Sequence, residues 1–117
     1  MNYRELATAA LAQYPKLDPA RVERALVILE NKTIKLARYD EEGIEIIRTK
    51  AAYCVKSPKT AGREEVWYIV RPEKKSCQCY DSAAGNICKH RIAVYLYQEL
   101  PLRQFAELAQ NVPASVV

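Results

Sequence analysis

The sequence predicts an α+β fold, in which an N-terminal helical pair precedes a small antiparallel β-sheet of three to four strands and a buried C-terminal helix. Apolar residues recur at helical spacing up to about residue 31, alternate at strand spacing from there to about residue 71, and return to helical spacing after residue 88. With 117 residues, half of them hydrophobic, the chain has the size of one domain with one core. We therefore expect a single domain over 1–117, made of the helical pair (1–32), a β-sheet and helix core (33–99), and a short helix with a tail (100–117).

Two helices are expected before residue 32. Asn2 and Glu5 have the spacing of a capping box, with Asn in place of Ser or Thr, and Pro15 ends the first helix. Asp18 is expected to cap the second helix, with Pro19 at its first position, and Asn31 is expected to end it in a left-handed conformation. The apolar faces of both helices predict that they pack as a pair: Tyr3, Leu6, Ala7, Ala10, Leu11 and Tyr14 on the first, and Val22, Ala25, Leu26 and Leu29 on the second.

The segment after residue 32 reads as strands. Thr33–Tyr39 and Ile44–Thr49 flank a polar four-residue connection that ends in glycine, which predicts a hairpin. Ala52–Ser57 is the next extended run, and its Cys54 is expected to be a small buried hydrophobe. Glu65–Arg71 is apolar on both faces, so we expect it to be a central strand.

The C-terminal part of the sequence is helical again. Lys89–Gln98 is apolar on most of its helical surface, which predicts burial. Leu100–Pro101 is expected to break this helix, because proline lacks the backbone donor that a helix interior needs. Leu102–Ala109 then predicts one more short helix, followed by a frayed tail over 111–117.

Three of the four cysteines and the only histidine lie within fourteen consecutive positions, in the pattern Cys-x-Cys, eight residues, Cys-x-His. Three thiolates and one imidazole are a donor set of closed tetrahedral zinc sites. The spacing therefore predicts one structural Zn²⁺ held within segment 74–91, in a zinc knuckle that leads from the sheet into the buried helix. The ligands would be Cys77, Cys79, Cys88 and His90.

The cellular compartment favours metal binding over disulfide formation. No apolar run approaches the length of about 18 residues that a membrane span needs, and the first residues lack the pattern of a signal peptide. We therefore expect an intracellular protein, cytoplasmic or, in a eukaryote, nuclear, without a membrane partner. In a reducing compartment a cluster of Cys and His is more typical of a metal site than of disulfides.

These residues resemble the SWIM-type zinc finger. The resemblance rests on a strand pair with a Tyr- and Val-rich second member, then Cys-x-Cys, a short loop, and Cys-Lys-His followed by Ile-Ala-Val-x-Leu. It covers about residues 44–97, and 19–99 with the elements before it. The resemblance implies that the same four residues bind zinc, and it implies a role in DNA binding or in protein interaction without choosing between them. One departure is Tyr80-Asp81, where many members have Pro-Asp or a similar dipeptide.

The distribution of charge favours a polyanionic partner. Residues 48–91 carry ten Lys and Arg against four Asp and Glu, whereas 1–47 carry seven against eight and 92–117 carry one against two. A basic excess around a metal-binding segment is typical of nucleic-acid binding, and we favour DNA. Tyr80 is a candidate for base stacking. The expected phosphate contacts are Lys74, Lys75, Lys89 and Arg91, extended by Lys56, Lys59 and Arg63.

The alternative is a protein-interaction adaptor in which the finger only stabilises the fold. It is supported by the apolar helix over Leu102–Leu108 and by the valines of the tail, Val112, Val116 and Val117. We do not expect an enzyme or a small-molecule substrate, because the sequence offers no second histidine, no glycine-rich phosphate loop and no nucleophile paired with a base.

Overall fold

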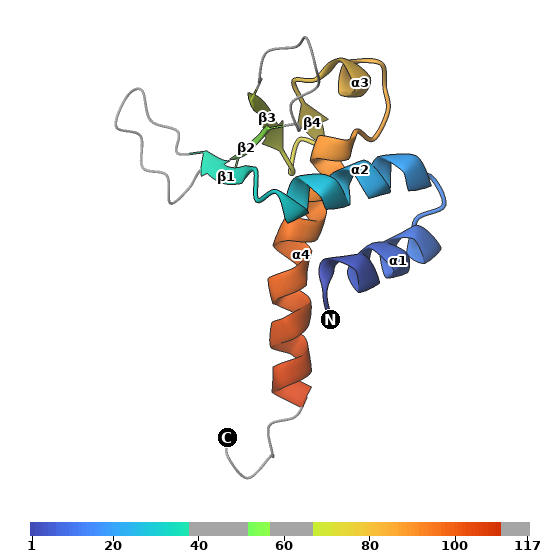
Figure 1. Cartoon of the computed structure of the whole chain (residues 1–117), viewed down its shortest axis with the longest axis vertical. Coiled ribbons are helices and arrows are strands. Elements are labelled where there is room, and N and C mark those ends of the chain that lie inside the picture. The colour runs from blue at the N-terminus through green and yellow to red at the C-terminus, as the bar shows by residue number, and fades with distance from the viewer. Residues whose placement is uncertain (38–51, 57–66, 111–117) are drawn as a thin grey trace.

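The computed structural model describes residues 1–37, 52–56 and 67–110, and it confirms the predicted α+β class (Figure 1). No helix in these ranges is both long enough and apolar enough to pass through a lipid bilayer. In chain order the elements are α1 (Tyr3–Gln13), α2 (Pro19–Glu30), β1 (Ile34–Ala37), β2 (Ala52–Lys56), β3 (Trp67–Arg71), β4 (Ser76–Cys77), α3 (Tyr80–Ala83) and α4 (Lys89–Gln110).

The four strands form one antiparallel sheet in the order β1-β2-β3-β4. Strand β3 lies between β2 and the two-residue β4, so the prediction of a central strand is confirmed. Val70 of β3 pairs with Cys77 of β4, which fixes the first predicted metal ligand to the sheet. The predicted strand Ile44–Thr49 lies outside the described residues, and within them β1 pairs with β2.

The N-terminal helices begin where their capping residues predict. The Asn2 side chain accepts a hydrogen bond of 2.8 Å from the backbone N–H of Glu5. The Asp18 carboxylate accepts one of 3.0 Å from the N–H of Ala20, and Pro19 occupies the first helical position. Each side chain satisfies a donor that the helix itself leaves without a partner.

The end of α2 differs from the prediction by one residue. Asn31 keeps a right-handed conformation, with φ of −81°, while Lys32 is left-handed, with φ of 54°. The N–H groups of Lys32 and Thr33 bond to the carbonyls of Leu29 and Ile28, the pattern of a Schellman motif. Asn31 is the C-cap of α2, and its side chain donates a 3.0 Å hydrogen bond to the Val27 carbonyl. The following residue, Lys32, takes the left-handed conformation.

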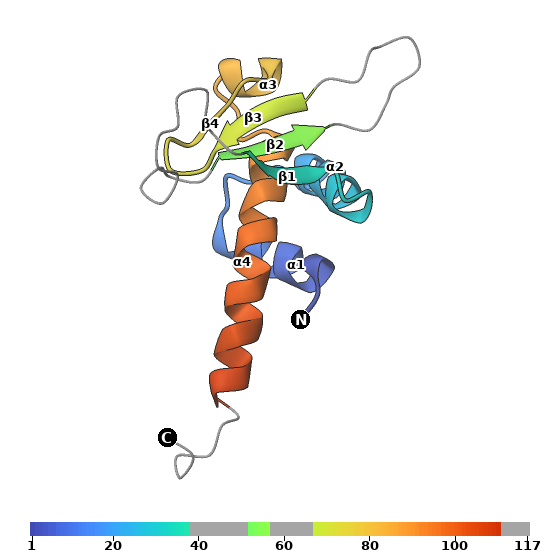
Figure 2. The ribbon, with the colours of Figure 1, turned by 90° about the vertical axis from the view of Figure 1, so that its left-hand side faces the viewer.

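Helix α4 is the centre of the core. It starts beneath the sheet, passes α2 and α1, and then continues beyond the rest of the fold (Figures 1 and 2). Its buried side chains pack with the inner residues of α1 and α2 and with two valines of the sheet. The core therefore joins the N-terminal helices and the sheet through one helix. Its buried members include Leu6, Val22, Leu26, Ile28, Val55, Val70, Ile92, Val94, Leu96 and Leu100.

The predicted break at Pro101 is wrong, because α4 runs without interruption from Lys89 to Gln110. Proline removes one backbone hydrogen bond, but interactions that span this position hold the helix on both sides. Leu100 is buried directly before it. The Arg103 side chain donates a 2.7 Å hydrogen bond to Glu99, and Gln104 donates one of 3.3 Å to the Met1 carbonyl.

Two leucines of α4 provide a test of this core. Leu96 is fully buried, whereas Leu102 is 64% exposed on the same helix. Leu96→Ala should lower the free energy of unfolding by about 2–5 kcal/mol, because it removes buried methyl groups and leaves a cavity. Leu102→Ala should change it by no more than about 0.5 kcal/mol. Urea unfolding followed by circular dichroism measures both. Equal effects would contradict the placement of α4 in the core.

Candidate metal centre

The structure brings the four predicted ligands together from two segments of the chain. Their ligand atoms, three Sγ atoms and one imidazole nitrogen, all lie within 4.8 Å of one another. Cys79, Cys88 and His90 are buried, and Cys77 is half-buried. The cluster lies where β4, α3 and the first turn of α4 meet (Figure 1).

The first pair of ligands comes from the end of the sheet. Cys77 is the last residue of β4. The backbone N–H of Gln78 still donates to the Ile69 carbonyl at 3.3 Å, which extends the ladder by one bond. Cys79 then caps the short helix α3, and its Sγ accepts a hydrogen bond of 3.4 Å from the N–H of Ser82. The chain therefore turns sharply between the two sulfurs, as a zinc knuckle does.

The second pair comes from the start of α4. The Cys88 carbonyl accepts from the N–H of Ile92 at 3.1 Å, and its Sγ accepts from the N–H of Arg91 at 3.4 Å. His90 lies in the first turn, with its ring centroid 4.7 Å from that of Tyr68 on β3. Cys88 therefore directly precedes α4, and His90 is the second residue of that helix.

The three cysteines differ in their protonation. The pKa of Cys88 is lowered to about 4, mainly because its sulfur accepts a hydrogen bond from the Cys77 thiol, with further bonds from His90 and the backbone of Arg91. The pKa of Cys77 is raised by its hydrogen bond to Cys88 and by burial. Burial is the main cause that raises the pKa of Cys79. The hydrogen bonds among the sulfurs therefore favour ionisation of Cys88 over that of Cys77 and Cys79.

The arrangement fits a tetrahedral zinc ion. With zinc–sulfur bonds of about 2.3 Å, sulfurs at the corners of a tetrahedron lie roughly 3.8 Å apart. A set within 4.8 Å needs only small side-chain movements to reach that geometry. Three sulfurs and one imidazole supply four donors, which fill a tetrahedral shell.

The predicted phosphate contacts do not all lie together. Lys74 and Lys75 are exposed on the turn between β3 and β4, and Lys89 and Arg91 are half-buried at the start of α4. Of these four, Lys75 and Arg91 line the same groove. The Nζ of Lys56 lies 5.5 Å from the centre of the Trp67 ring. Lys59 and Arg63 are outside the described residues. Cys54 is half-buried and is not part of the ligand cluster.

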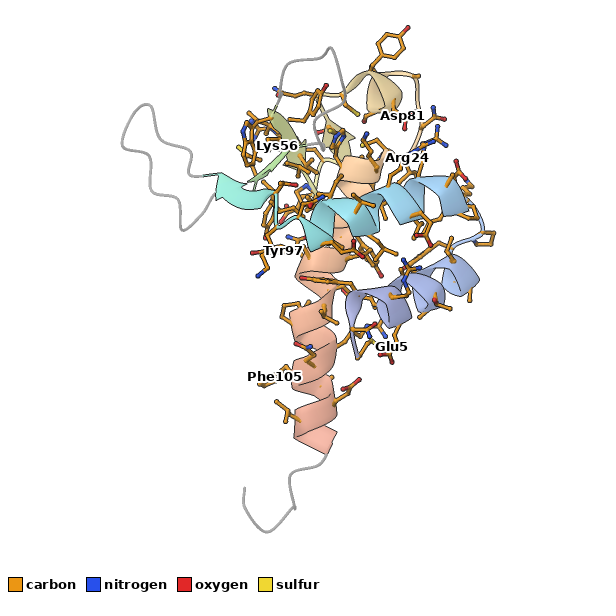
Figure 3. The ribbon with its side chains drawn as sticks, viewed as in Figure 1. Glu5, Arg24, Lys56, Asp81, Tyr97 and Phe105 are labelled. Atoms are coloured by element: carbon orange, nitrogen blue, oxygen red, sulfur yellow. The ribbon has the colours of Figure 1, made fainter. Side chains whose placement is uncertain are left out.

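Sequence reasoning missed an ion pair between α2 and the loop that joins the two ligand pairs. Arg21 donates to both carboxylate oxygens of Asp81, at 2.8 and 2.9 Å, and to Asp18 at 3.0 Å. Asn86 also donates to Asp81, at 2.9 Å. Figure 3 shows Asp81 beside the N-terminal half of α2. The available signal was Asp81 itself, a carboxylate in the segment between the two ligand pairs.

This pair holds the ligand loop against the N-terminal helices, so its removal should destabilise the fold. The hydrogen bond from Arg21 lowers the pKa of Asp81, so the contribution is present at neutral pH and disappears as pH falls below the ordinary value of 3.8. Asp81→Asn should therefore lower the melting temperature at pH 7 and have a smaller effect at pH 3.

Glu23→Gln is the matched control. It removes an equally well-formed arginine pair, between Arg4 and Glu23, whose side chains are 60% and 61% exposed. Such exposed pairs contribute little. Thermal melts at both pH values compare the two variants, and equal shifts at pH 7 would contradict a special role for Asp81.

Comparison with known protein families gives one match. Residues 61–99 match the family described as the SWIM zinc finger. The match contains all four clustered ligands, and it begins at residue 61, whereas the sequence resemblance begins at about residue 44. No curated protein and no solved structure matches the chain. The matched segment and the converging Cys and His residues establish that residues 61–99 of this chain are a SWIM zinc finger.

Proposed function

We propose that the finger binds one zinc ion with a structural role. The observation that supports this is the convergence of Cys77, Cys79, Cys88 and His90 within 4.8 Å. Four protein donors leave no coordination position for a substrate, so the proposed role is not catalytic. The ion would join the end of the sheet to the start of α4, and would therefore stabilise the contact between the sheet and the core helix.

Zinc removal tests this role. A strong chelator should lower the melting temperature, because metal binding is coupled to local folding. Binding should release protons near pH 7, because zinc binds thiolates and the pKa values of Cys77 and Cys79 are raised in the metal-free site. Zinc affinity should therefore fall as pH decreases. Calorimetry in buffers of different ionisation enthalpy measures the proton release.

Cysteine variants provide the control for the metal experiment. Cys79→Ser should lose zinc, whereas Cys54→Ser should retain it, because Cys54 lies on β2 outside the cluster. An unchanged melting temperature after verified zinc removal would contradict the structural role.

We propose further that the finger binds nucleic acid, with double-stranded DNA as the favoured form. The supporting observation is that Lys75 and Arg91, from the two segments that supply the ligands, line the same groove. Lys74 is exposed next to Lys75, and Tyr80 is 91% exposed next to Cys79. Cations of this kind contact phosphates and give affinity without base specificity, and an exposed tyrosine is available for stacking.

A titration against DNA at two salt concentrations tests this proposal. Affinity should fall steeply with salt. Reversal of charge at Lys74, Lys75, Lys89 and Arg91 should weaken binding. It should also reduce the slope of log K against log salt concentration by about 0.9 for each phosphate that the variant no longer neutralises. Fluorescence anisotropy with double- and single-stranded DNA measures both effects and identifies the preferred form. The absence of binding at low salt would contradict the proposal.

Two lysines form a matched pair for this titration. Lys75 and Lys32 are both exposed, and their φ angles are 51° and 54°. Lys75 lies near the metal centre, whereas Lys32 lies at the end of α2. Lys75→Glu should therefore weaken DNA binding more than Lys32→Glu, at equal cost to the fold.

Protein interaction is the second candidate, and a separate observation favours it. The part of α4 beyond Pro101 presents three large apolar side chains to solvent: Leu102, Phe105 and Leu108 are 64%, 73% and 67% exposed. Phe105 points away from the rest of the fold in Figure 3. Exposed apolar clusters of this kind mark interaction sites. This surface is separate from the metal centre, so a failed DNA titration would leave this role standing.

A further inference from the structure

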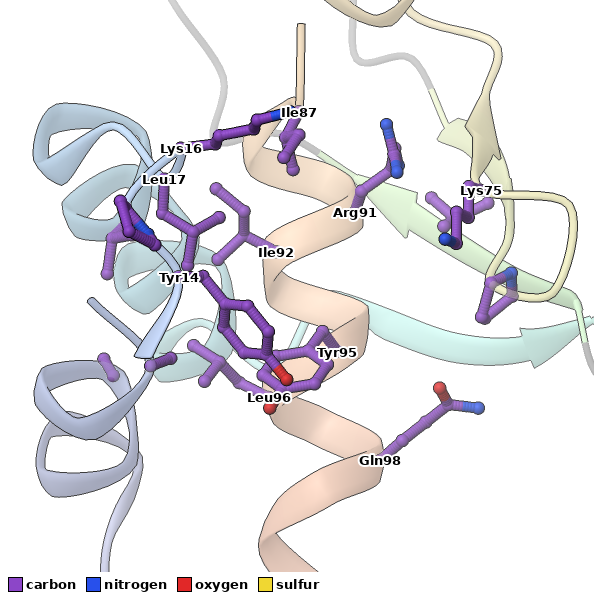
Figure 4. A pocket seen from close by; sticks show the side chains of 16 residues that line it. Tyr14, Lys16, Leu17, Lys75, Ile87, Arg91, Ile92, Tyr95, Leu96 and Gln98 are labelled. Carbon is purple, nitrogen blue, oxygen red and sulfur yellow. The ribbon is translucent and has the colours of Figure 1, made fainter. Parts of the chain in front are cut away.

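A groove lies where the N-terminal helices meet the zinc finger. It has a volume of about 580 Å³, within the range of ligand sites in proteins. Three parts of the chain form it: the end of α1 with the connection to α2, the end of β3 with the turn that follows, and the first turns of α4 (Figure 4). The groove exists only because the N-terminal pair packs against the finger.

The floor of the groove is apolar. Aliphatic side chains from α1, α2, β3 and α4 line it, among them Ala10, Val22, Val70 and Ile92. Tyr14 and Tyr95 form an edge-to-face pair within it, with ring centroids 6.1 Å apart. A ligand with a bulky apolar body would therefore be desolvated favourably here.

The charged groups of the groove have one sign. Lys16, Lys75 and Arg91 line it, and no carboxylate is among the described lining residues. None of these three cations forms an ion pair with a carboxylate within the described part of the chain. In Figure 4, Lys16 and Arg91 lie at one end of the groove, Lys75 lies at its side, and Gln98 lies at the other end.

We propose that this groove binds a small organic acid, with its apolar body on the floor and its anionic group between Lys75 and Arg91. The apolar floor alone would accept neutral molecules. The three cations, none of which is ion-paired to a carboxylate within the described residues, favour an anion, because a charge-assisted hydrogen bond to a carboxylate or sulfonate is stronger than one to a neutral group. This site goes beyond the proposed function, since its binding does not depend on nucleic acid. The proposal adds a small-molecule ligand to a chain for which the sequence predicts no small-molecule substrate. No sequence pattern indicates the groove.

Two dyes with the same apolar body test the proposal on the full-length, zinc-loaded protein. 1-Anilinonaphthalene-8-sulfonate carries a sulfonate, and N-phenyl-1-naphthylamine lacks it. The sulfonate should bind saturably with one site per chain, as measured by its fluorescence. Lys75→Gln and Arg91→Gln should each weaken binding of the sulfonate dye on the order of five- to ten-fold, which corresponds to about 1.0–1.4 kcal/mol. Neither variant should change the affinity for the neutral dye.

Lys74→Gln is the matched control, because Lys74 is the exposed neighbour of Lys75 on the same turn and does not line the groove. It should leave both affinities within about two-fold of the wild type. Zinc content and near-ultraviolet circular dichroism confirm that each variant is folded. The proposal is overturned if binding of the sulfonate dye does not saturate, or if Lys74→Gln lowers the affinity for that dye as much as Lys75→Gln does. It is also overturned if Lys75→Gln and Arg91→Gln lower the affinity for the neutral dye as much as that for the sulfonate dye.

Discussion

The start of α4 contributes both to the ligand cluster and to the hydrophobic core, and the rest of the fold depends on both. Cys88, directly before the helix, and His90, in its first turn, belong to the ligand cluster, while Ile92, Ala93 and Leu96 belong to the core. Because a helix is rigid over this length, the position of the core helix fixes the position of two ligands. The other two ligands are fixed by the sheet, through the pairing of Val70 with Cys77. The packing of the core helix against the sheet therefore sets the relative positions of all four ligands, so the sheet, the core and the metal centre form one unit.

The N-terminal helices belong to this unit through two kinds of contact. Apolar residues of α1 and α2 pack against α4, and Arg21 holds the ligand loop through Asp81. The Arg21–Asp81 contact is polar and partly exposed, so it contributes less free energy than the apolar packing does. Its main effect is to fix the position of the ligand loop. It explains how a chain of this length orders a loop of eight residues between two pairs of ligands. The groove beside Tyr95 follows from the same packing, since its walls come from both halves of the chain.

Much of this could be predicted because its signals are local. The caps at Asn2 and Asp18 and the spacing of the four ligands depend on neighbours in sequence, and the structure agrees with each. The helix through Pro101 could not be predicted from local pattern, because the contact of Gln104 with Met1 joins residues that are 103 positions apart. The ion pair of Arg21 with Asp81 is another contact that no local pattern predicts, because the two residues are sixty positions apart. The ligand spacing predicts that Lys75 and Arg91 lie near each other, but the groove between them depends on α1, which no local pattern places there.

The unequal protonation of the three cysteines has a consequence for what surrounds them. The hydrogen bonds among the sulfurs lower the pKa of Cys88, while burial and the same hydrogen bonds raise the pKa values of Cys77 and Cys79. An incoming metal ion would therefore meet one sulfur that ionises readily and two that must lose a proton before they bind. A divalent ion with three thiolates carries a net charge of minus one. Metal binding would therefore add no positive charge to the surface that holds Lys75 and Arg91.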